Sequence, residues 1–152
     1  MKKRLFLFTL FASLSTLLPA QVGDSFSSPQ YELVGEVESL RRFIRLEQRD
    51  IGEGNKLYKF SFSDREYIHL NYIGIVLFTA SEKELKTFKN YLLKGFELEN
   101  DRDIRFKLGK SDIVVRKFSG RTIKMTVYSE GGFKKRSAYI KPREIPLIFN
   151  EG

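Results

Sequence analysis

The chain contains no cysteine and only one histidine, His69, among its 152 residues. Without thiols it has no cysteine nucleophile, no disulfide framework and no lipid-attachment cysteine of a bacterial lipoprotein. One histidine cannot build the histidine clusters that hold many zinc ions. No Gly-x-Ser-x-Gly motif presents a serine to His69, which lies in a strand-like stretch. The sequence therefore predicts neither a nucleophile-based nor a zinc-based active site.

A glycine-rich phosphate loop is also missing. The glycines at 52, 54, 131 and 132 fall in predicted hairpin turns and match no nucleotide-binding fingerprint. Carboxylates recur at every second position across residues 97–103, but this run lacks the glycine turn and the distal glutamate of a calcium loop. A solvated connection is the simpler interpretation. We expect no cofactor, no bound metal and no catalytic activity, although a glycosidase-type pair of carboxylates could still meet in space.

The first twenty residues differ from the rest of the chain. Three basic residues at positions 2–4 precede an apolar run over residues 5–18, and Ala20 places a small residue before Gln21. This is the pattern of a secretory signal peptide cleaved after Ala20. An uncleaved membrane anchor is the alternative, but the run is shorter than the roughly 20 residues that span a bilayer. Because no disulfides follow, we expect a bacterial protein exported to the periplasm or beyond.

The expected mature chain is long enough for one domain with its own hydrophobic core. Glycine, serine and proline make residues 21–30 a flexible lead-in, and we assign residues 31–149 to a single α+β domain. No later apolar run is long enough to cross a membrane, so we expect no transmembrane helix in the mature chain.

The clearest helix covers residues 81–95. Ser81 can accept a hydrogen bond from the start of the helix while Glu84 reaches back to the Ser81 amide, which is a capping box. Apolar residues repeat at helical spacing around Phe88, and lysines occupy most of the remaining surface. Gly95 suits the left-handed position just past the end of the helix.

Strand-like patterns precede this helix. Residues 31–37 alternate weakly, and residues 39–49 are compatible with either a helix or a strand. We favour a strand for residues 39–49, because a hairpin connection follows and residues 56–62 alternate well. Residues 66–79 form a long strand that ends apolar on both sides, which is typical of a central strand or of one covered on both faces. Gly74 within it indicates a bulge or bend.

Four more strand-like stretches follow the helix, separated by turn residues: residues 104–108, 112–118, 121–129 and 133–140. This spacing indicates an antiparallel meander. The last stretch, residues 142–149, is either a short helix or an edge strand, because Pro146 excludes a central strand.

The sequence therefore predicts an α+β fold in which a strand-rich antiparallel sheet of about seven to eight strands packs on one clear helix. The order of the elements also permits two ββββα units. Nucleic-acid-binding proteins of the PUR and Whirly kind are built from such units. This chain resembles them in topology alone, with no motif carried over, and a fold by itself does not give a function.

Basic residues are concentrated in the C-terminal part of the chain. Without the signal peptide, 24 basic and 19 acidic side chains remain, a net charge of +5. Residues 21–100 carry a net charge of −2 and residues 101–152 a net charge of +7. This asymmetry suggests an anionic partner. Alternatively, the lysines and arginines only keep exposed strand edges from associating.

Within this basic part, aromatic residues are interleaved with lysine and arginine, and such a pattern on a sheet can bind single-stranded nucleic acid by stacking and phosphate contacts. The candidate anion-binding residues are Arg116, Lys117, Arg121, Lys124, Phe133, Lys134, Lys135, Arg136 and Tyr139. For an exported protein the anion would be lipopolysaccharide, an acidic glycan, a lipid headgroup or an acidic protein.

We therefore expect an exported bacterial module that binds a partner without catalysing a reaction, through a basic C-terminal sheet face. Two alternatives stay open. One is a single-stranded nucleic-acid-binding protein of the ββββα type, which export argues against. The other is a structural component of an envelope assembly, which would carry an exposed apolar patch or an unpaired sheet edge.

Overall fold

The computed structural model describes residues 30–40, 42–66, 72–129 and 135–151. Within them the chain forms eight strands, all paired antiparallel, and two α-helices. This confirms a strand-rich antiparallel α+β fold. The expected signal peptide, nearly all of the expected lead-in, and His69 lie outside the described residues. None of the helices in this described part is long and apolar enough to cross a membrane.

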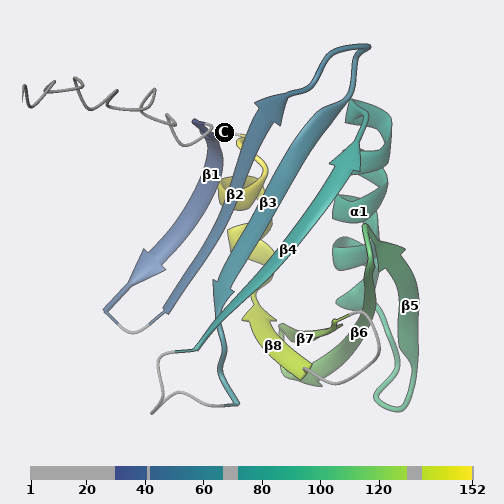
Figure 1. The fold of residues 1–152 in the computed structure, drawn as a ribbon. Helices are drawn as coiled ribbons and strands as arrows, with labels where there is room; N and C mark the ends of the chain where they lie inside the picture. The colour runs from purple at the N-terminus through teal and green to yellow at the C-terminus, as the bar shows by residue number, and fades with distance from the viewer. Residues whose placement is uncertain (1–29, 41, 67–71, 130–134, 152) are drawn as a thin grey trace, which may run out of the picture.

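The eight strands form two sheets, where we expected one. The first sheet has the order β1-β2-β3-β4, with β1 (Glu32–Ser39), β2 (Arg42–Asp50), β3 (Lys56–Ser63) and β4 (Ile73–Ala80). The second sheet has the order β5-β6-β7-β8, with β5 (Asp103–Leu108), β6 (Ser111–Ser119), β7 (Thr122–Tyr128) and β8 (Lys135–Ile140). The chain divides in this way because each four-stranded meander has an apolar face, and two sheets can bury these faces against each other and against helices (Figure 1).

Two stretches that the sequence left ambiguous are now assigned. Of the stretch 39–49, residues 42–49 lie in strand β2, as we favoured, whereas Ser39 ends strand β1. Residues 142–148 are helical: they form the 3-10 helix η2 (Pro142–Glu144) and the helix α2 (Ile145–Ile148). Pro146 lies at the start of α2, where a residue without an amide hydrogen breaks no helical hydrogen bond. The single helix that we expected is thus accompanied by a second, four-residue one.

Helix α1 (Glu82–Gly95) begins as the sequence predicts. The Ser81 hydroxyl accepts a hydrogen bond from the Glu84 amide at 3.4 Å, and the Ser81 amide donates to Glu84 Oε2 at 2.8 Å. The predicted end is wrong, because Gly95 is the last helical residue and the cap, Phe96, is right-handed with φ −74°. Gly95 is needed for packing instead: a Cβ there would lie 2.5 Å from Val115 Cγ1 on the second sheet.

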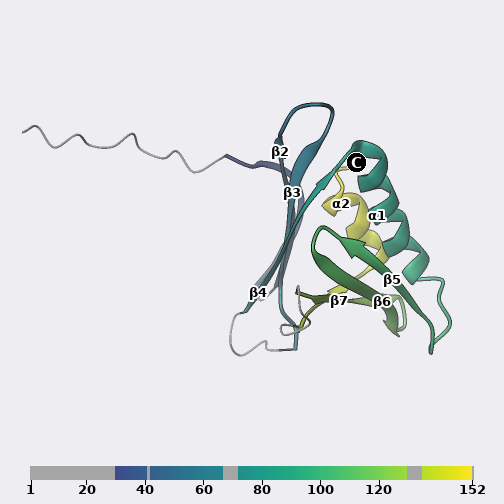
Figure 2. The ribbon, with the colours of Figure 1, turned by 45° about the vertical axis from the view of Figure 1, so that its right-hand side comes forward.

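The helices connect the two halves of the fold. Helix α1 follows the first sheet and contacts β4 of that sheet as well as β5 and β6 of the second, whereas α2 follows the second sheet and contacts β1 and β2 of the first. At Gly35 of β1 an added Cβ would lie 2.1 Å from the carbonyl oxygen of Leu147, so α2 and β1 lie backbone to backbone. Figure 2 shows both helices on the same side of the first sheet, with no described element on its opposite side.

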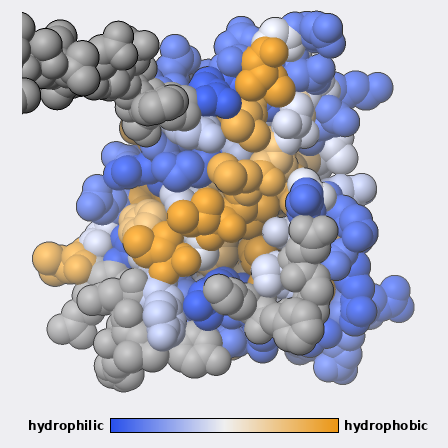
Figure 3. Space-filling model, in the orientation of Figure 1, coloured by the Kyte–Doolittle hydropathy of each residue, from blue (hydrophilic) through white to orange (hydrophobic). Residues whose placement is uncertain are grey.

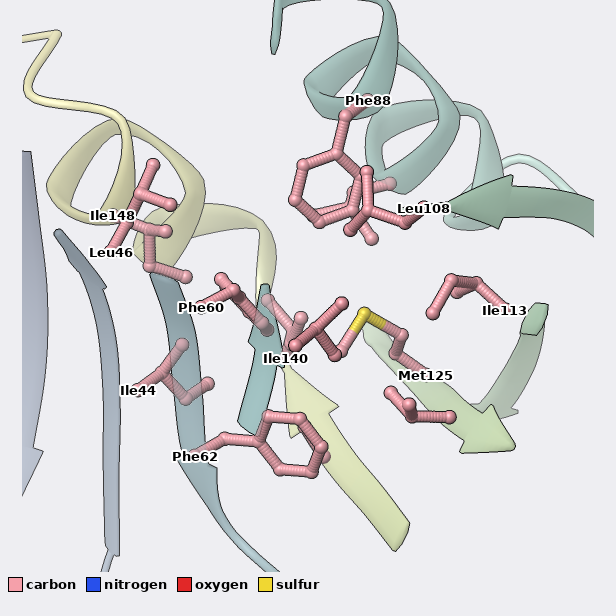
Figure 4. Close-up of a cluster of buried hydrophobic side chains, with 14 of the residues drawn as sticks. Ile44, Leu46, Phe60, Phe62, Phe88, Leu108, Ile113, Met125, Ile140 and Ile148 are labelled. Atoms are coloured by element: carbon pink, nitrogen blue, oxygen red, sulfur yellow. The ribbon is translucent and has the colours of Figure 1, made fainter. Parts of the chain in front are cut away.

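The core lies between the two sheets and the helices (Figure 4). Phe88 of α1 is 2 % exposed and contacts aromatic rings from three directions. Its ring centroid lies 5.7 Å from Phe60 on the first sheet, 5.9 Å from Phe106 on the second and 5.7 Å from Phe149 after α2. Edge-to-face and tilted pairs of this kind stabilise a core beyond the burial of their area.

Strand β4 begins at Ile73, and Glu66, where we expected the strand to start, lies in a turn. The strand also differs from the prediction in its position and in its burial. It is an edge strand and not a central one, and its side chains alternate strictly between buried and exposed. Gly74 makes no bulge, since the register between β3 and β4 is regular throughout. A Cβ at Gly74 would lie 2.3 Å from the Phe62 ring, so the glycine makes room for a core aromatic residue.

Candidate anion-binding site

Antiparallel register brings three of the predicted residues into one row across the second sheet. Arg116 on β6 pairs with Lys124 on β7, and Lys124 pairs with Tyr139 on β8. Asp103 of β5 completes the row next to Arg116. Because the neighbouring positions 115, 123 and 125 are buried in the core, this row lies on the outer face of the second sheet.

Other predicted residues lie elsewhere. Lys117 pairs with the buried Ile123 and therefore lies on the core side of β6. Arg121 is exposed in the turn between β6 and β7. Phe133 and Lys134 lie outside the described residues.

The cations of this outer face contact carboxylates of the same chain. Arg116 Nη2 lies 2.8 Å from Asp103 Oδ2, and Arg105 Nη2 lies 3.1 Å from the same oxygen. Hydrogen bonds from Arg105 and then from Arg116 hold the pKa of Asp103 below its ordinary value. Arg116 is therefore not a free cation.

Lys124 and Lys135 share a second carboxylate, Glu66, from the connection that follows β3. Lys124 donates a hydrogen bond to Glu66 Oε1, and the Lys135 Nζ lies 3.4 Å from the same atom. The hydrogen bond from Lys124 is the main reason that the pKa of Glu66 lies below its ordinary value. Nothing in the local sequence indicates this contact, because 58 positions separate Glu66 from Lys124.

The same connection holds Arg136 through a buried carboxylate. Arg136 Nε lies 3.4 Å from Asp64 Oδ2, and its guanidinium lies 4.6 Å from the Tyr72 ring centroid. Asp64 Oδ1 accepts hydrogen bonds from the amides of Glu66 at 3.0 Å and Ser137 at 3.3 Å. Asp64 thus fastens the first sheet to strand β8, and its partner Arg136 has a structural role.

Beside this face lies a pocket of about 620 Å³, formed by ends of strands from both sheets and lined by three cationic residues. We call it the basic pocket. Its lining residues are Ser39, Arg42, Arg65, Phe118, Ser119, Thr122, Tyr139 and Lys141. Of the predicted residues only Tyr139 is among them, and Arg121 lies one position before Thr122 in the chain.

Arg42 of the basic pocket is neutralised by Glu144. The Arg42 guanidinium donates to both carboxylate oxygens, at 2.7 Å and 2.6 Å, and also to the Tyr139 carbonyl oxygen. Glu144 accepts a further hydrogen bond from the Lys141 amide at 2.8 Å. Burial disfavours ionisation of Glu144, but the hydrogen bonds from Arg42 and Lys141 outweigh it and keep its pKa below the ordinary value.

The other two cations of the basic pocket, Arg65 and Lys141, are exposed, and neither side chain forms an ion pair with any described residue. Glu144, a carboxylate beside the pocket, is already engaged by Arg42. The basic pocket therefore presents two positive charges that no described acidic group neutralises through an ion pair.

Two aromatic rings complete the basic pocket. Phe118 is 57 % exposed, and its ring lies at 71° to the ring of Tyr139 with the centroids 4.6 Å apart. Lys124 Nζ lies 5.8 Å from the Tyr139 ring centroid. This contact links the pocket to the row of charged residues on the second sheet.

The outer face of the first sheet has a different character. Ile73, Ile75 and Leu77 of β4 are 53 %, 55 % and 52 % exposed, and we call them the β4 stripe. Figure 3 shows an apolar patch across the face that the first sheet presents in Figure 1. Their partners across β3 include Ser61 and Lys59, so the stripe borders polar residues.

Neither a metal site nor a similar protein identifies the function. Among the described residues, no group of three or more histidine, cysteine, aspartate or glutamate side chains is arranged to hold a metal ion. No protein-family model, curated protein or solved structure matches the chain. The geometry of the basic pocket and of the β4 stripe therefore carries the functional information.

Proposed function

We propose that the chain is an exported, non-catalytic module that binds an anionic partner through the basic pocket. The observation that carries this proposal is that Arg65 and Lys141 line one pocket while neither forms an ion pair with a described carboxylate. A lysine and an arginine in one concave site attract phosphate and carboxylate groups.

The proposal moves the binding site away from the basic sheet face that the sequence indicated. On that face Asp103 contacts Arg116, and Glu66 contacts Lys124 and Lys135. An incoming anion would have to displace these carboxylates before it could bind there. At the basic pocket no such exchange is needed, because Glu144 stays with Arg42.

Polyanion binding by paired variants tests the proposal. The double variant Arg65→Ala/Lys141→Ala removes two charges from the pocket, and Lys83→Ala/Lys86→Ala removes two exposed charges from helix α1. We expect the pocket variant to bind inorganic polyphosphate at least tenfold more weakly than the parent chain, measured by titration calorimetry at low salt. The helix variant has the same net charge and should lose less than threefold. Equal losses in the two variants, or no binding by the parent chain, would contradict the proposal.

A second candidate function, a structural component of an assembly, is favoured by the β4 stripe. Monomeric proteins seldom expose a contiguous apolar patch without a binding role. The stripe lies on an edge strand whose eight residues include no charged residue and no proline, and edge strands usually carry such residues to prevent association.

A third candidate, a single-stranded nucleic-acid-binding protein, is supported by the order of four strands, a helix, four strands and a short helix. Two points weigh against it. The signal peptide predicted from residues 1–20 directs the chain out of the cytoplasm, and the cations that would follow a nucleic-acid backbone across the second sheet are already paired with Asp103 and Glu66.

A further inference from the structure

We propose that the ligand of the basic pocket is a sugar ring that carries a carboxylate or a phosphate group. This inference rests on the proposed anion-binding function and specifies its ligand class. The ring would stack on Phe118, its charged group would lie near Arg65 and Lys141, and its hydroxyls would meet Ser119 and Thr122.

The exposed aromatic ring of Phe118 favours a ligand that contains a ring. Phe118 lies near the end of β6 with more than half of its surface exposed, although burial of a phenyl ring is favourable. Its contact with Tyr139 fixes the orientation of the two rings. A phenyl face carries partial negative charge and attracts the slightly positive C–H groups of a sugar ring. Phe118 is therefore placed to contact a ligand that has an apolar ring face.

The hydroxyl groups that line the basic pocket also favour a sugar. Ser39, Ser119 and Thr122 line the pocket. Ser39 makes one long contact, 3.4 Å to the Arg42 carbonyl oxygen, and the side chains of Ser119 and Thr122 hydrogen-bond to no described residue. Each hydroxyl can both donate and accept. A ligand with many hydroxyls satisfies such groups, whereas a bare inorganic anion would use them only as donors.

The volume of the basic pocket also fits a sugar. A pocket of about 620 Å³ lies within the range of roughly 300–1,000 Å³ that is common for small-molecule sites. It is larger than one inorganic phosphate requires, so the charged group would occupy only the part near Arg65 and Lys141. The remaining space extends to Phe118 and Thr122.

The surroundings also favour one unit of an acidic sugar over a strand of nucleic acid. A strand needs several cations in succession to follow its phosphates. Beyond Tyr139 the next cation along the row is Lys124, which donates to Glu66, and the one after it is Arg116, which is held by Asp103. Along this row, the positive charge that no described carboxylate pairs with therefore ends at the pocket.

The experiment compares four small probes on the purified chain by calorimetry: glucose, inorganic phosphate, glucose 6-phosphate and glucuronate. We expect both charged sugars to bind at least tenfold more tightly than glucose and than inorganic phosphate, because each of these lacks one of the two recognition elements. The ratio between the two charged sugars shows whether a phosphate or a carboxylate is preferred. A single-stranded oligonucleotide is titrated in parallel.

Substitutions at the ring then locate the site. Phe118→Ala should reduce the affinity for the charged sugars at least tenfold and leave inorganic phosphate binding unchanged, and Phe118→Tyr should retain most of the affinity. Leu147→Ala, at a residue 56 % exposed on α2 and outside the pocket, is the matched control and should change neither. Since Phe118 is exposed, its variants should fold normally.

The outcomes separate this inference from the proposed function. Equal affinity for glucose 6-phosphate and inorganic phosphate, or an unchanged Phe118→Ala variant, would overturn the sugar assignment while anion binding stands. Failure of every anion to bind, polyphosphate included, would overturn both. Tighter binding of the oligonucleotide than of either charged sugar, with the same dependence on Phe118, would replace the sugar by a nucleic acid.

Discussion

The outer faces of the two sheets show two ways in which a chain can leave a sheet face uncovered. Both sheets are four-stranded antiparallel meanders, and each contacts the helix that follows the other. On the second sheet the outer face carries cations paired to Asp103 and Glu66. On the first sheet the edge of the outer face carries the uncharged β4 stripe.

The difference indicates that the two faces have different roles. A face whose charges are satisfied within the chain is stable in water and gains little from a partner. An exposed apolar stripe gains free energy from any surface that removes it from water. We therefore expect an anion to bind at the basic pocket and a protein partner to bind at the separate β4 stripe.

The largest effect on the free energy of unfolding is expected from a substitution at the contact between β1 and α2. Gly35→Ala places a Cβ 2.1 Å from a backbone oxygen of Leu147, which cannot rotate away. We expect a loss of about 2–4 kcal/mol in the free energy of unfolding, measured in urea. Gly95→Ala meets only side-chain atoms, of Val115 and Ile123, and gains up to about 1 kcal/mol of helix propensity, so its loss should be smaller. An equal or larger loss for Gly95→Ala would contradict the backbone contact between α2 and β1.

Breaking the buried ion pair between Arg42 and Glu144 should have the next largest effect on the free energy of unfolding. The side chains of Arg42 and Glu144 are 15 % and 6 % exposed, so Glu144→Gln leaves a buried guanidinium without its anion. We expect a loss of about 2–3 kcal/mol at pH 7. Glu151→Gln, which breaks the more exposed pair with Lys89, is the control and should cost less than about 1 kcal/mol.

The dependence on pH follows from the lowered pKa of Glu144. Because folding lowers this pKa from its ordinary value of 4.5, ionised Glu144 stabilises the fold above that pH, and the stabilisation is lost as the pH falls through the folded value. The free energy of unfolding of the parent chain should therefore fall more steeply below about pH 4.5 than that of Glu144→Gln. If the free energies of unfolding of the parent chain and of Glu144→Gln fall in parallel, ionisation of Glu144 does not stabilise the fold.

A smaller effect is expected when the outer face of the second sheet is converted into a free cationic surface. Glu66→Gln removes the carboxylate shared by Lys124 and Lys135. We expect polyphosphate affinity to rise about three- to tenfold, with a change in stability below about 1 kcal/mol. Glu38→Gln removes one charge from the first sheet and should raise affinity less than twofold. Equal gains would mean that net charge alone determines binding.

The smallest effect on stability is expected at the β4 stripe. Ile75→Ser changes an exposed side chain and should alter the free energy of unfolding by no more than about 0.5 kcal/mol. It should nevertheless weaken concentration-dependent self-association, measured by sedimentation velocity, whereas Val114→Ser on the second sheet should not. A parent chain that stays monomeric at high concentration would show that the stripe does not bind its own copy.

The sequence predicted the parts of the fold that depend on neighbouring residues. The capping box of Ser81 and Glu84 is confirmed, and so is the preference for a strand over residues 39–49. The edge position of β4 and the packing role of Gly95 were predicted wrongly. In both cases the residue pattern fits two arrangements, and contacts with distant parts of the chain select between them.

The candidate site was predicted less well than the fold. The sequence indicated a basic face around Arg116 and Lys124, but it could not show that Asp103 and Glu66 pair with them. Arg65 and Lys141 lie 76 positions apart, and no local pattern distinguishes either of them from other surface cations. Only the meeting of strand ends from both sheets brings them to one pocket.

The sequence by itself determined that this chain is rich in antiparallel strands, has a strongly capped helix and carries excess positive charge in its C-terminal part. Periodicity, capping and turn formation depend on interactions within a few residues, so they can be predicted locally. The tertiary structure alone decided which cations are paired, which are available and which apolar residues stay exposed. Those properties depend on the distances between side chains that are far apart in the sequence, and folding of the two sheets against each other's helices sets these distances.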